Sequence, residues 1–188
     1  MSRQRTIDKV QLFQETEKLI LENGYHSFHF KALAERLNVA RSTIYNYYSK
    51  KEELVTDYMM HVIDTLMTRL NELETEIEFE SKLIKVIQIW VEYSDIHQAL
   101  QILPVLDHHA SPLVEANVQK LFGFFQELNE RVERLINEGQ QLELLRRDIP
   151  VTGLSGIIMA MVKAPNTRLS KQEWVSAIYN VLMNGMAK

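Results

Sequence analysis

The segment from residue 29 to residue 54 constrains the fold of this chain more than any other part of the sequence. Its first half repeats apolar side chains at the spacing of one helix face: Phe30, Leu33, Ala34 and Leu37. Asn38 follows, and asparagine tolerates the left-handed backbone conformation that ends many helices. The pattern predicts a short helix that stops at a tight turn.

A second short helix is predicted after this turn, and its side chains include many groups that can reach DNA. Ile44 and Tyr48 lie four residues apart, so we expect both to face inward. The remaining positions then face outward: Arg41, Ser42, Thr43, Tyr45, Asn46 and Tyr47. Two helices joined by a tight turn form a helix-turn-helix, which places its second helix in the major groove. DNA binding is therefore the leading hypothesis.

The sequence Ser49-Lys50-Lys51-Glu52 predicts the capped start of a long helix, with Ser49 as N-cap and Glu52 at the third helical position. The positive end of the helix dipole, with two lysines beside it, suits a phosphate. The predicted DNA-binding residues are Lys31, Arg41, Ser42, Thr43, Tyr45, Asn46, Tyr47, Lys50 and Lys51. Those expected to approach base edges rather than phosphates are Arg41, Ser42, Thr43 and Asn46.

Charge is distributed unevenly along the chain. Residues 1–51 contain nine lysines and arginines against five acidic residues, a net charge of +4, whereas the whole chain has a formal net charge of −4. A basic N-terminal quarter suits a DNA reader, because phosphate contacts supply affinity and steering. The alternative is that these cations merely solvate a small helical surface, and the exposed aromatic-rich helix favours DNA over that alternative.

Composition narrows the class of protein further. A chain of 188 residues can bury a sizeable core, and it contains no cysteine, which excludes disulfides and thiolate metal ligands and fits the cytoplasm. The N-terminus is polar and basic, and no run approaches the ~18 apolar residues of a membrane span. Glycine and proline are few and strand-like alternation is absent, so we expect an all-α protein.

Helical periodicity and stop signals divide the chain into about nine helices. Gly24 ends the first helix, Ser111-Pro112 begins a long one as N-cap and first residue, and Ser170 to Glu173 form a second capping box. We expect residues 1–50 to form a three-helix, helix-turn-helix DNA-binding domain. Residues 51–188 would then form a helical domain for effector binding and dimerisation.

The N-terminal quarter resembles the TetR family of transcriptional regulators. The residues on which the resemblance rests are Gly24-Tyr25, Leu33-Ala34, Val39, Thr43-Ile44-Tyr45, Tyr47, Tyr48 and Lys51-Glu52-Glu53-Leu54. The resemblance implies a homodimer that binds a palindromic DNA operator and is released by a small-molecule effector of unknown identity. Repression is expected, although a transcriptional activator would bind DNA and effector by the same physical interactions.

Three positions depart from the family pattern. Asn38 stands where the family usually has glycine in the turn, and it preserves the backbone requirement. His29 and Ala40 stand where the family often has hydroxyl residues before the two helices. We therefore expect the cap at each of these helix starts, which contributes ~1 kcal/mol, to be removed or weakened.

The last two predicted helices have wide apolar arcs and several small residues, including Gly156 and Ala160. Packing into the chain's own domain is one interpretation. The other, which the resemblance favours, is a two-fold four-helix interface with a second copy. The residues predicted at this interface are Ile158, Met161, Trp174, Ile178 and Val181.

The middle helices are rich in large, adaptable side chains. They are either ordinary core or the lining of an effector pocket, which is typically apolar with a few polar groups. The predicted pocket residues are Met60, Met67, Trp90, Tyr93, His97, Phe122 and Phe125. An apolar or aromatic ligand, including a cationic one, would fit such a lining.

Neither a cofactor nor a resident metal is expected, and the chain is not expected to be an enzyme. The sequence lacks a phosphate-binding GxxxxGK loop, HExxH and GxSxG, and its acids and histidines are scattered. Asp107-His108-His109 is a poor metal site, because three adjacent residues rarely converge on one ion. Two alternatives remain: a helical enzyme that uses this segment, and a dimeric module of the same fold that binds a protein partner instead of DNA.

Overall fold

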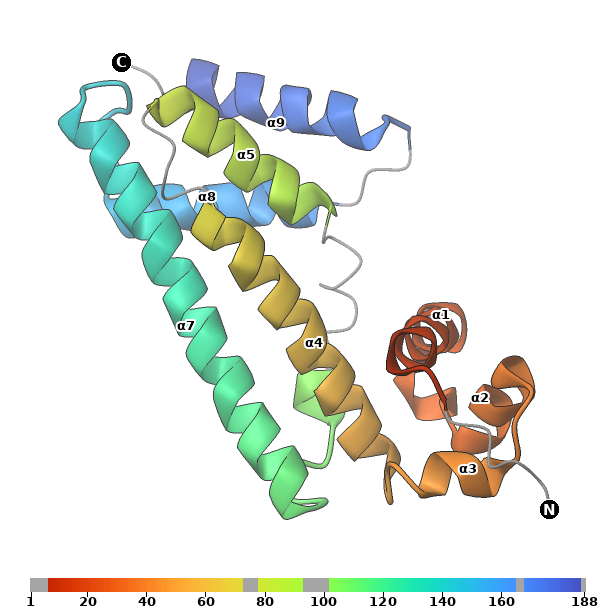
Figure 1. Cartoon of the computed structure of the whole chain (residues 1–188). Coiled ribbons are helices and arrows are strands. Elements are labelled where there is room, and N and C mark those ends of the chain that lie inside the picture. Colours follow the sequence, from red (N-terminus) through yellow and green to blue (C-terminus); the bar gives the residue numbers. More distant parts are fainter. Residues whose placement is uncertain (1–6, 73–77, 93–101, 165–167, 187–188) are drawn as a thin grey trace. The chain divides into compact units, whose positions relative to one another are not determined.

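The computed structural model describes residues 7–72, 78–92, 102–164 and 168–186, and these residues form helices and connecting turns without any strand. The α-helices are α1 (Lys9–Ser27), α2 (Phe30–Leu37), α3 (Arg41–Tyr45), α4 (Lys51–Glu72), α5 (Phe79–Glu92), α7 (Pro112–Gln141), α8 (Val151–Lys163) and α9 (Lys171–Met186). A short 3-10 helix, η2, spans Leu103–Val105. The predicted all-α fold is confirmed, and the helix count is close to the nine expected (Figure 1).

The chain divides into two compact units. The first contains residues 1–63 and 98–121, and the second contains residues 64–97 and 122–188. Both units include part of α4 and part of α7, since each of these helices crosses a unit boundary. These units are defined by the contacts within each of them. The boundary predicted at residue 50 instead separates a DNA-binding domain from an effector-binding and dimerisation domain, and it stays a prediction.

The first unit has a core made by α1, α2, α3 and the start of α4. Leu33, Ile44 and Leu54 are fully buried in it, and Phe13 is nearly so. Gly24 has a positive φ of 75° inside α1, so the helix is interrupted there and resumes to Ser27. Glycine adopts this conformation without steric cost. The predicted stop at Gly24 is thus a kink, after which the chain continues helically for one short turn.

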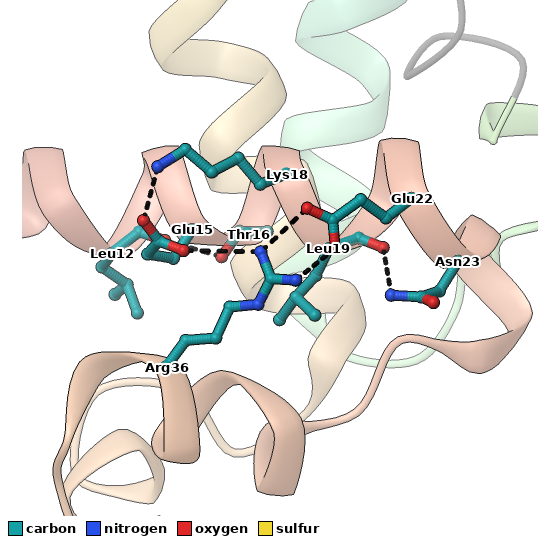
Figure 2. Close-up of polar contacts among 8 residues, drawn as sticks. All are labelled: Leu12, Glu15, Thr16, Lys18, Leu19, Glu22, Asn23 and Arg36. Atoms are coloured by element: carbon teal, nitrogen blue, oxygen red, sulfur yellow. Dashed lines mark hydrogen bonds and ion pairs between the residues drawn. The ribbon is translucent and has the colours of Figure 1, made fainter.

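Ion pairs on the surface of the first unit hold α2 against α1 (Figure 2). The Arg36 guanidinium on α2 reaches two carboxylates on α1: Nη1 lies 3.2 Å from Glu22 Oε1 and 3.6 Å from Glu15 Oε2. Lys18 donates to the same Glu15 carboxylate at 2.7 Å. The Lys18 hydrogen bond is the main reason that the pKa of Glu15 is lowered, and Arg36 adds to the effect. These ion pairs therefore fix α2, the first helix of the helix-turn-helix, against α1.

The second unit is a layer of helices around α5. Helix α9 packs along α5, and α8 contacts both of them (Figure 1). The buried side chains between them include Ile87 from α5, Ile158 from α8, and Ile178 and Leu182 from α9. Burial of a large aliphatic side chain contributes about 1.5–3 kcal/mol, so these buried residues stabilise the layer.

Two of the predicted helix starts are confirmed. Helix α7 begins at Pro112, and the Ser111 hydroxyl accepts a hydrogen bond from the Val114 backbone N–H at 3.4 Å. Helix α9 begins after a reciprocal box in which Ser170 Oγ accepts from the Glu173 N–H, and Glu173 Oε2 accepts from the Ser170 N–H at 2.8 Å. Short polar side chains that satisfy the first N–H groups therefore set both helix boundaries.

Two glycines in α7 provide a test of packing in the second unit. A Cβ on Gly139 would lie 2.5 Å from the Phe79 ring and 2.8 Å from a Leu145 methyl group, whereas a Cβ on Gly123 would meet nothing within 4 Å. Gly139→Ala should lower the free energy of unfolding by about 1–3 kcal/mol through overpacking. Gly123→Ala should raise it by about 0.5–1 kcal/mol through helix propensity. Urea unfolding followed by circular dichroism measures both changes, and equal effects at the two positions would contradict the described packing.

Candidate nucleic-acid interface

The recognition helix α3 ends at Tyr45, so Asn46, Tyr47 and Tyr48 lie directly after it rather than on it, although the inward and outward positions are those that the sequence predicts. Ile44 and Tyr48 face the interior, with exposed fractions of 0% and 7%. Tyr45 and Tyr47 are 45% and 50% exposed, although large aromatic side chains are usually buried. Arg41 and Ser42 on α3 and Asn46 directly after it are also exposed, whereas Thr43 is half-buried. The surface of the helix therefore offers hydrogen-bonding groups and phenol rings to a partner.

The turn before α3 also forms as expected. Asn38 adopts the left-handed conformation, with φ 51° and ψ 49°, and the Val39 N–H donates to the Ala34 carbonyl at 3.0 Å. His29 caps α2 through a long hydrogen bond, in which its Nδ1 accepts from the Ala32 N–H at 3.4 Å. Ala40 precedes α3 without a side-chain cap, as its methyl group requires. The imidazole thus replaces the hydroxyl that is common at the first of these positions.

Tyr45 and Arg41 hold one another in place on the outer face of α3. Arg41 Nη2 donates to the Tyr45 hydroxyl at 2.7 Å, and the guanidinium carbon lies 5.2 Å from the centre of the phenol ring. The Tyr45 ring also contacts the ring of Phe30 in an edge-to-face arrangement, with 5.1 Å between the two ring centres. Fixed side chains lose less conformational entropy when they bind, so this pair is pre-organised for a partner.

The residue after the exposed tyrosines connects the recognition helix to α4. Tyr48 donates its hydroxyl hydrogen to Asp57 Oδ2 at 2.5 Å, and Lys9 Nζ lies 2.9 Å from the same oxygen. Burial and then the Asp57 carboxylate raise the pKa of Tyr48, so its phenol remains a donor at neutral pH. This chain of contacts fixes the end of the motif from which Tyr47 projects.

Glu53 organises the start of α4. Its Oε2 accepts hydrogen bonds from the Ser49 N–H at 2.8 Å, the Ser49 hydroxyl at 2.9 Å and the Lys50 N–H at 3.3 Å. Burial on its own would raise the pKa of Glu53, but hydrogen bonds from the Ser111 hydroxyl and from Ser49 and Lys50 lower it. The predicted box between Ser49 and Glu52 is therefore wrong by one residue, because α4 begins at Lys51 rather than at Lys50.

Glu52 has a different partner. The Tyr25 hydroxyl donates to Glu52 Oε1 at 2.8 Å, which links the end of α1 to the start of α4. Burial, followed by Glu52 and Asp107, raises the pKa of Tyr25 and keeps its phenol protonated. Sequence reasoning missed this role of Tyr25 and the roles of Glu53 and Asp57. The available signal was the four-residue spacing from Ser49 to Glu53, which brings two side chains to one helix face.

The three lysines predicted at phosphates differ in their surroundings. Lys31 is exposed in the first turn of α2. Lys51 Nζ donates to the carbonyls of Tyr25 and Phe28, at 3.3 and 3.5 Å, and lies 4.3 Å above the Tyr25 ring. Lys50 Nζ donates to the Ala110 carbonyl. Both ammonium groups therefore also stabilise the junction of the motif with α4, a role that the sequence did not predict.

The residues predicted in an effector pocket are not all brought together. A cavity of about 320 Å³ lies in the second unit, and Trp90 is the member of the predicted set that lines it. Met67 is buried elsewhere, Phe125 is half-buried and Phe122 is 54% exposed. Met60 is half-buried in the first unit. The remaining two predicted residues lie outside the described part of the chain: Tyr93 and His97.

The residues predicted at a dimer interface fall into two groups. Ile158 and Ile178 are buried within the protomer, with exposed fractions of 2% and 1%. Val181 is 57% exposed, and Met161 and Trp174 are half-buried. Ile157, which was not predicted, is 42% exposed. The sequence identified apolar helices correctly, but periodicity alone does not distinguish the face used inside the protomer from the face left outside.

The Asp107–His109 segment is satisfied by its own surroundings. His108 Nε2 lies 2.6 Å from the Leu103 carbonyl oxygen, His109 Nδ1 lies 3.2 Å from Glu115 Oε1, and the His109 N–H donates to the Asp107 carboxylate. In the part of the chain that the structure describes, no three histidine or acidic side chains group in a way that could hold a metal ion. None of the described helices combines the length and the apolar character needed to cross a membrane.

Comparisons with known proteins agree with this geometry. Residues 12–58 match the family model for bacterial regulatory proteins of the tetR family. The ketosteroid transcriptional regulator KstR2 of Mycobacterium tuberculosis is similar in structure, with a TM-score of 0.79, 15% identity, and coverage of 99% of this chain and 100% of that one. No curated protein matches in sequence.

Two further solved structures have the same fold. The TetR-family regulator PfmR from Thermus thermophilus has a TM-score of 0.77 and 15% identity, with 94% of this chain and 99% of that chain covered. AibR, solved with isovaleryl coenzyme A and operator DNA, has a TM-score of 0.72 and 16% identity, with 94% and 98% covered.

The matched residues include the exposed helix α3 and the turn before it, and the whole chain has an all-helical fold like that of KstR2. The family match covers residues 12–58, about a quarter of the chain, and over nearly its whole length the chain has the fold of a solved TetR-family regulator.

Acid titration tests the role of Glu53. Its pKa lies below the ordinary value of 4.5, so its stabilising contribution is complete above that pH and is lost as the pH falls through the lowered pKa. Glu53→Gln should reduce the free energy of unfolding at pH 7 by about 1–3 kcal/mol, because hydrogen bonds to a buried charged group are replaced. The difference between wild type and variant should shrink below pH 4.5, as urea unfolding at several pH values would show.

Glu52→Gln is the matched control for this titration, since it changes the neighbouring carboxylate, which accepts from the Tyr25 hydroxyl. It should cost less stability than Glu53→Gln. If Glu52→Gln instead caused the larger and more strongly pH-dependent loss of stability, the result would support the capping box predicted from the sequence and contradict the described hydrogen bonds.

Proposed function

We propose that this protein binds a palindromic DNA operator as a homodimer, represses transcription there, and is released by a small-molecule effector. The observation that supports this most directly is the recognition helix itself. Arg41 and Tyr45 on α3 and Tyr47 after it are exposed, while Ile44 and Tyr48 anchor this segment in the core. A rigid helix with an outward row of hydrogen-bonding groups fits the major groove of B-DNA.

The proposed contacts divide by chemistry. Arg41, Ser42 and Thr43 lie in the first turn of α3, which is the part closest to base edges in this motif, and Asn46, directly after the last residue of the helix, would also approach bases. Tyr45, Tyr47 and the lysines would contact phosphates, which set affinity and its dependence on salt. Each good base contact contributes about 1–3 kcal/mol to discrimination between sequences.

A homodimer through α8 and α9 is proposed because apolar side chains remain exposed on both helices. Ile157 on α8 and Val181 on α9 are 42% and 57% exposed, and Trp174 is half-buried. A Cβ added at Gly156 or at Gly185 would meet nothing within 4 Å, so the outer surface is open at both positions. A two-fold dimer would present two recognition helices to half-sites about one DNA turn apart.

Effector control is proposed to act through α4. Its first turn contains Glu52 and Glu53, which hold the helix-turn-helix, and its last turns contribute Leu70 to the cavity in the second unit. A ligand that shifts α4 would change the orientation of the recognition helices. A coupling free energy of about 1–3 kcal/mol changes operator affinity about 5–150-fold. AibR, solved with a coenzyme A thioester and operator DNA, shows that a protein of this fold can have both kinds of partner.

Loss of two recognition-helix groups tests the DNA-binding proposal. Arg41→Ala combined with Tyr47→Ala removes one base contact and one phosphate contact, so binding to DNA from upstream of the protein's own gene should weaken about 30-fold or more. Fluorescence anisotropy with a labelled duplex measures this affinity. The dimer should persist, because neither residue lies on α8 or α9.

Arg147→Ala is the control for that experiment, since Arg147 is an exposed cation of the second unit that donates to the Gln140 carbonyl. Its affinity for the duplex should equal that of the wild type. If the double variant also binds as the wild type does, α3 does not read DNA, and the alternative of a protein partner would replace this proposal.

A charge placed on the exposed face of α9 tests the dimer. Val181→Glu should convert the dimer to a monomer, because a carboxylate buried at an apolar interface loses hydration without gaining a partner. Ser176→Glu, an exposed position on another face of α9, should leave the dimer intact. Light scattering coupled to size-exclusion chromatography measures the mass of each variant. A Val181→Glu protein that remains dimeric would exclude this interface.

A further inference from the structure

The cavity of the second unit has an apolar floor. It lies among the last turns of α4, α5 and the second half of α7, with a volume of about 320 Å³. Its apolar lining consists of Leu70, Val86, Trp90, Leu128, Val132 and Leu135. All of these except the half-buried Val86 are buried. At about 30 Å³ for each water-sized group, the cavity accommodates roughly ten non-hydrogen atoms of a ligand.

The polar part of the lining is predominantly cationic. It consists of Lys82, Arg131, Arg134 and Glu138. The side chains of Lys82 and Arg131 are 22% and 18% exposed, whereas that of Arg134 is 64% exposed. Arg134 therefore lies at the mouth, and the other two cations lie deeper. A ligand that enters the apolar floor would keep its polar end beside these groups.

Each cation of the lining is balanced by a carboxylate, and two of these carboxylates lie outside the cavity. Arg131 Nη2 lies 2.8 Å from Glu127 Oε1, and Arg134 Nη1 lies 4.0 Å from Glu130 Oε2, both acids being one helical turn earlier on α7. Lys82 Nζ lies 2.7 Å from Glu138 Oε1. A guanidinium has five N–H donors, so it can hold a glutamate and a ligand carboxylate together.

A cationic ligand fits this lining poorly. Glu138 is the acidic residue among those that line the cavity, and Lys82 already neutralises it. Sites for organic cations surround the charge with aromatic faces, whereas the aromatic residue in this lining is Trp90 alone. The polar lining therefore supplies mainly N–H donors, which favours an anion over the cationic aromatic ligand that the sequence left open.

We propose that this cavity binds a small amphipathic anion, a carboxylate on an unbranched apolar chain of about eight carbons. The chain would occupy the floor formed by Trp90, Leu70 and Leu128, and the carboxylate would bind Arg131 and Arg134. This inference rests on the proposed function in one respect, because it names the chemical class of the effector. Binding itself does not depend on DNA.

Calorimetric titration of the full-length protein without DNA tests the class of ligand. Octanoate, octanamide and octylammonium share one apolar chain and differ in the charge of the head group. Octanoate should bind about tenfold tighter than either of the others, because it alone gains charge-assisted hydrogen bonds from the arginines. Equal affinities for the three compounds, or tighter binding of octylammonium, would overturn the proposal.

Variants of α7 locate the site. Arg131→Met keeps the length of the side chain but removes its charge, and it should weaken octanoate binding about tenfold while leaving octanamide unchanged. Arg131→Lys keeps the charge and should retain most of the affinity. Lys120→Met removes an exposed cation from the same helix outside the cavity and should have no effect. Circular dichroism verifies that each variant is folded.

The outcomes separate this inference from the proposed function. Octanoate binding that requires Arg131 but leaves DNA affinity unchanged would support the site and contradict effector control. Intact DNA binding without any preference for octanoate would contradict the site alone. Octanoate binding that is insensitive to Arg131→Met, with the fold intact, would place the anion elsewhere and overturn the assignment.

Discussion

The carboxylate of Glu53 receives hydrogen bonds from both sides of the junction that holds the recognition helix. Ser49 and Lys50 donate from the turn that follows the recognition helix, and the hydroxyl of Ser111 donates from the residue before α7. Glu53 is 9% exposed, so burial of its charge is unfavourable without these donors. The start of α4, the end of the DNA-binding motif and the start of α7 are therefore held by one group. Displacement of any one of the three would break hydrogen bonds to this carboxylate.

The same region contains a second set of contacts that reach outward to the recognition surface. Tyr48 is fixed by Asp57, and Tyr45 is held between Phe30 and Arg41. The exposed groups of α3 are thus supported by a buried layer, which lowers the entropy lost on binding. Helix α4 supplies the supporting carboxylates at one end and part of the cavity at the other. A single helix therefore links the two proposed ligand sites covalently, and this continuity is the basis of the proposed control.

Much of the fold could be predicted because its signals are local. Apolar spacing predicted which face of α3 is buried, Asn38 predicted the turn, and Ser111 and Ser170 predicted two helix starts. The errors arose where several local choices have similar energies. Glu52 and Glu53 are both acceptable partners for Ser49, and the partnership of Glu52 with Tyr25 on α1 decides between them. The lining of the cavity was harder to predict, because it comes from three helices. Its polar part includes Arg131 and Lys82, which look like surface charges in the sequence.

Selection from random double-stranded DNA tests the central claim most directly. The full-length protein would be incubated with a pool of random duplexes, and the bound fraction would be amplified and sequenced over several rounds. A dimer that presents two copies of α3 should enrich a two-fold symmetric sequence with half-sites about one DNA turn apart. The Arg41→Ala, Tyr47→Ala protein should enrich nothing. Enrichment of an asymmetric sequence would contradict the symmetric dimer, and the absence of any enriched sequence with the wild type would contradict DNA recognition by this protein.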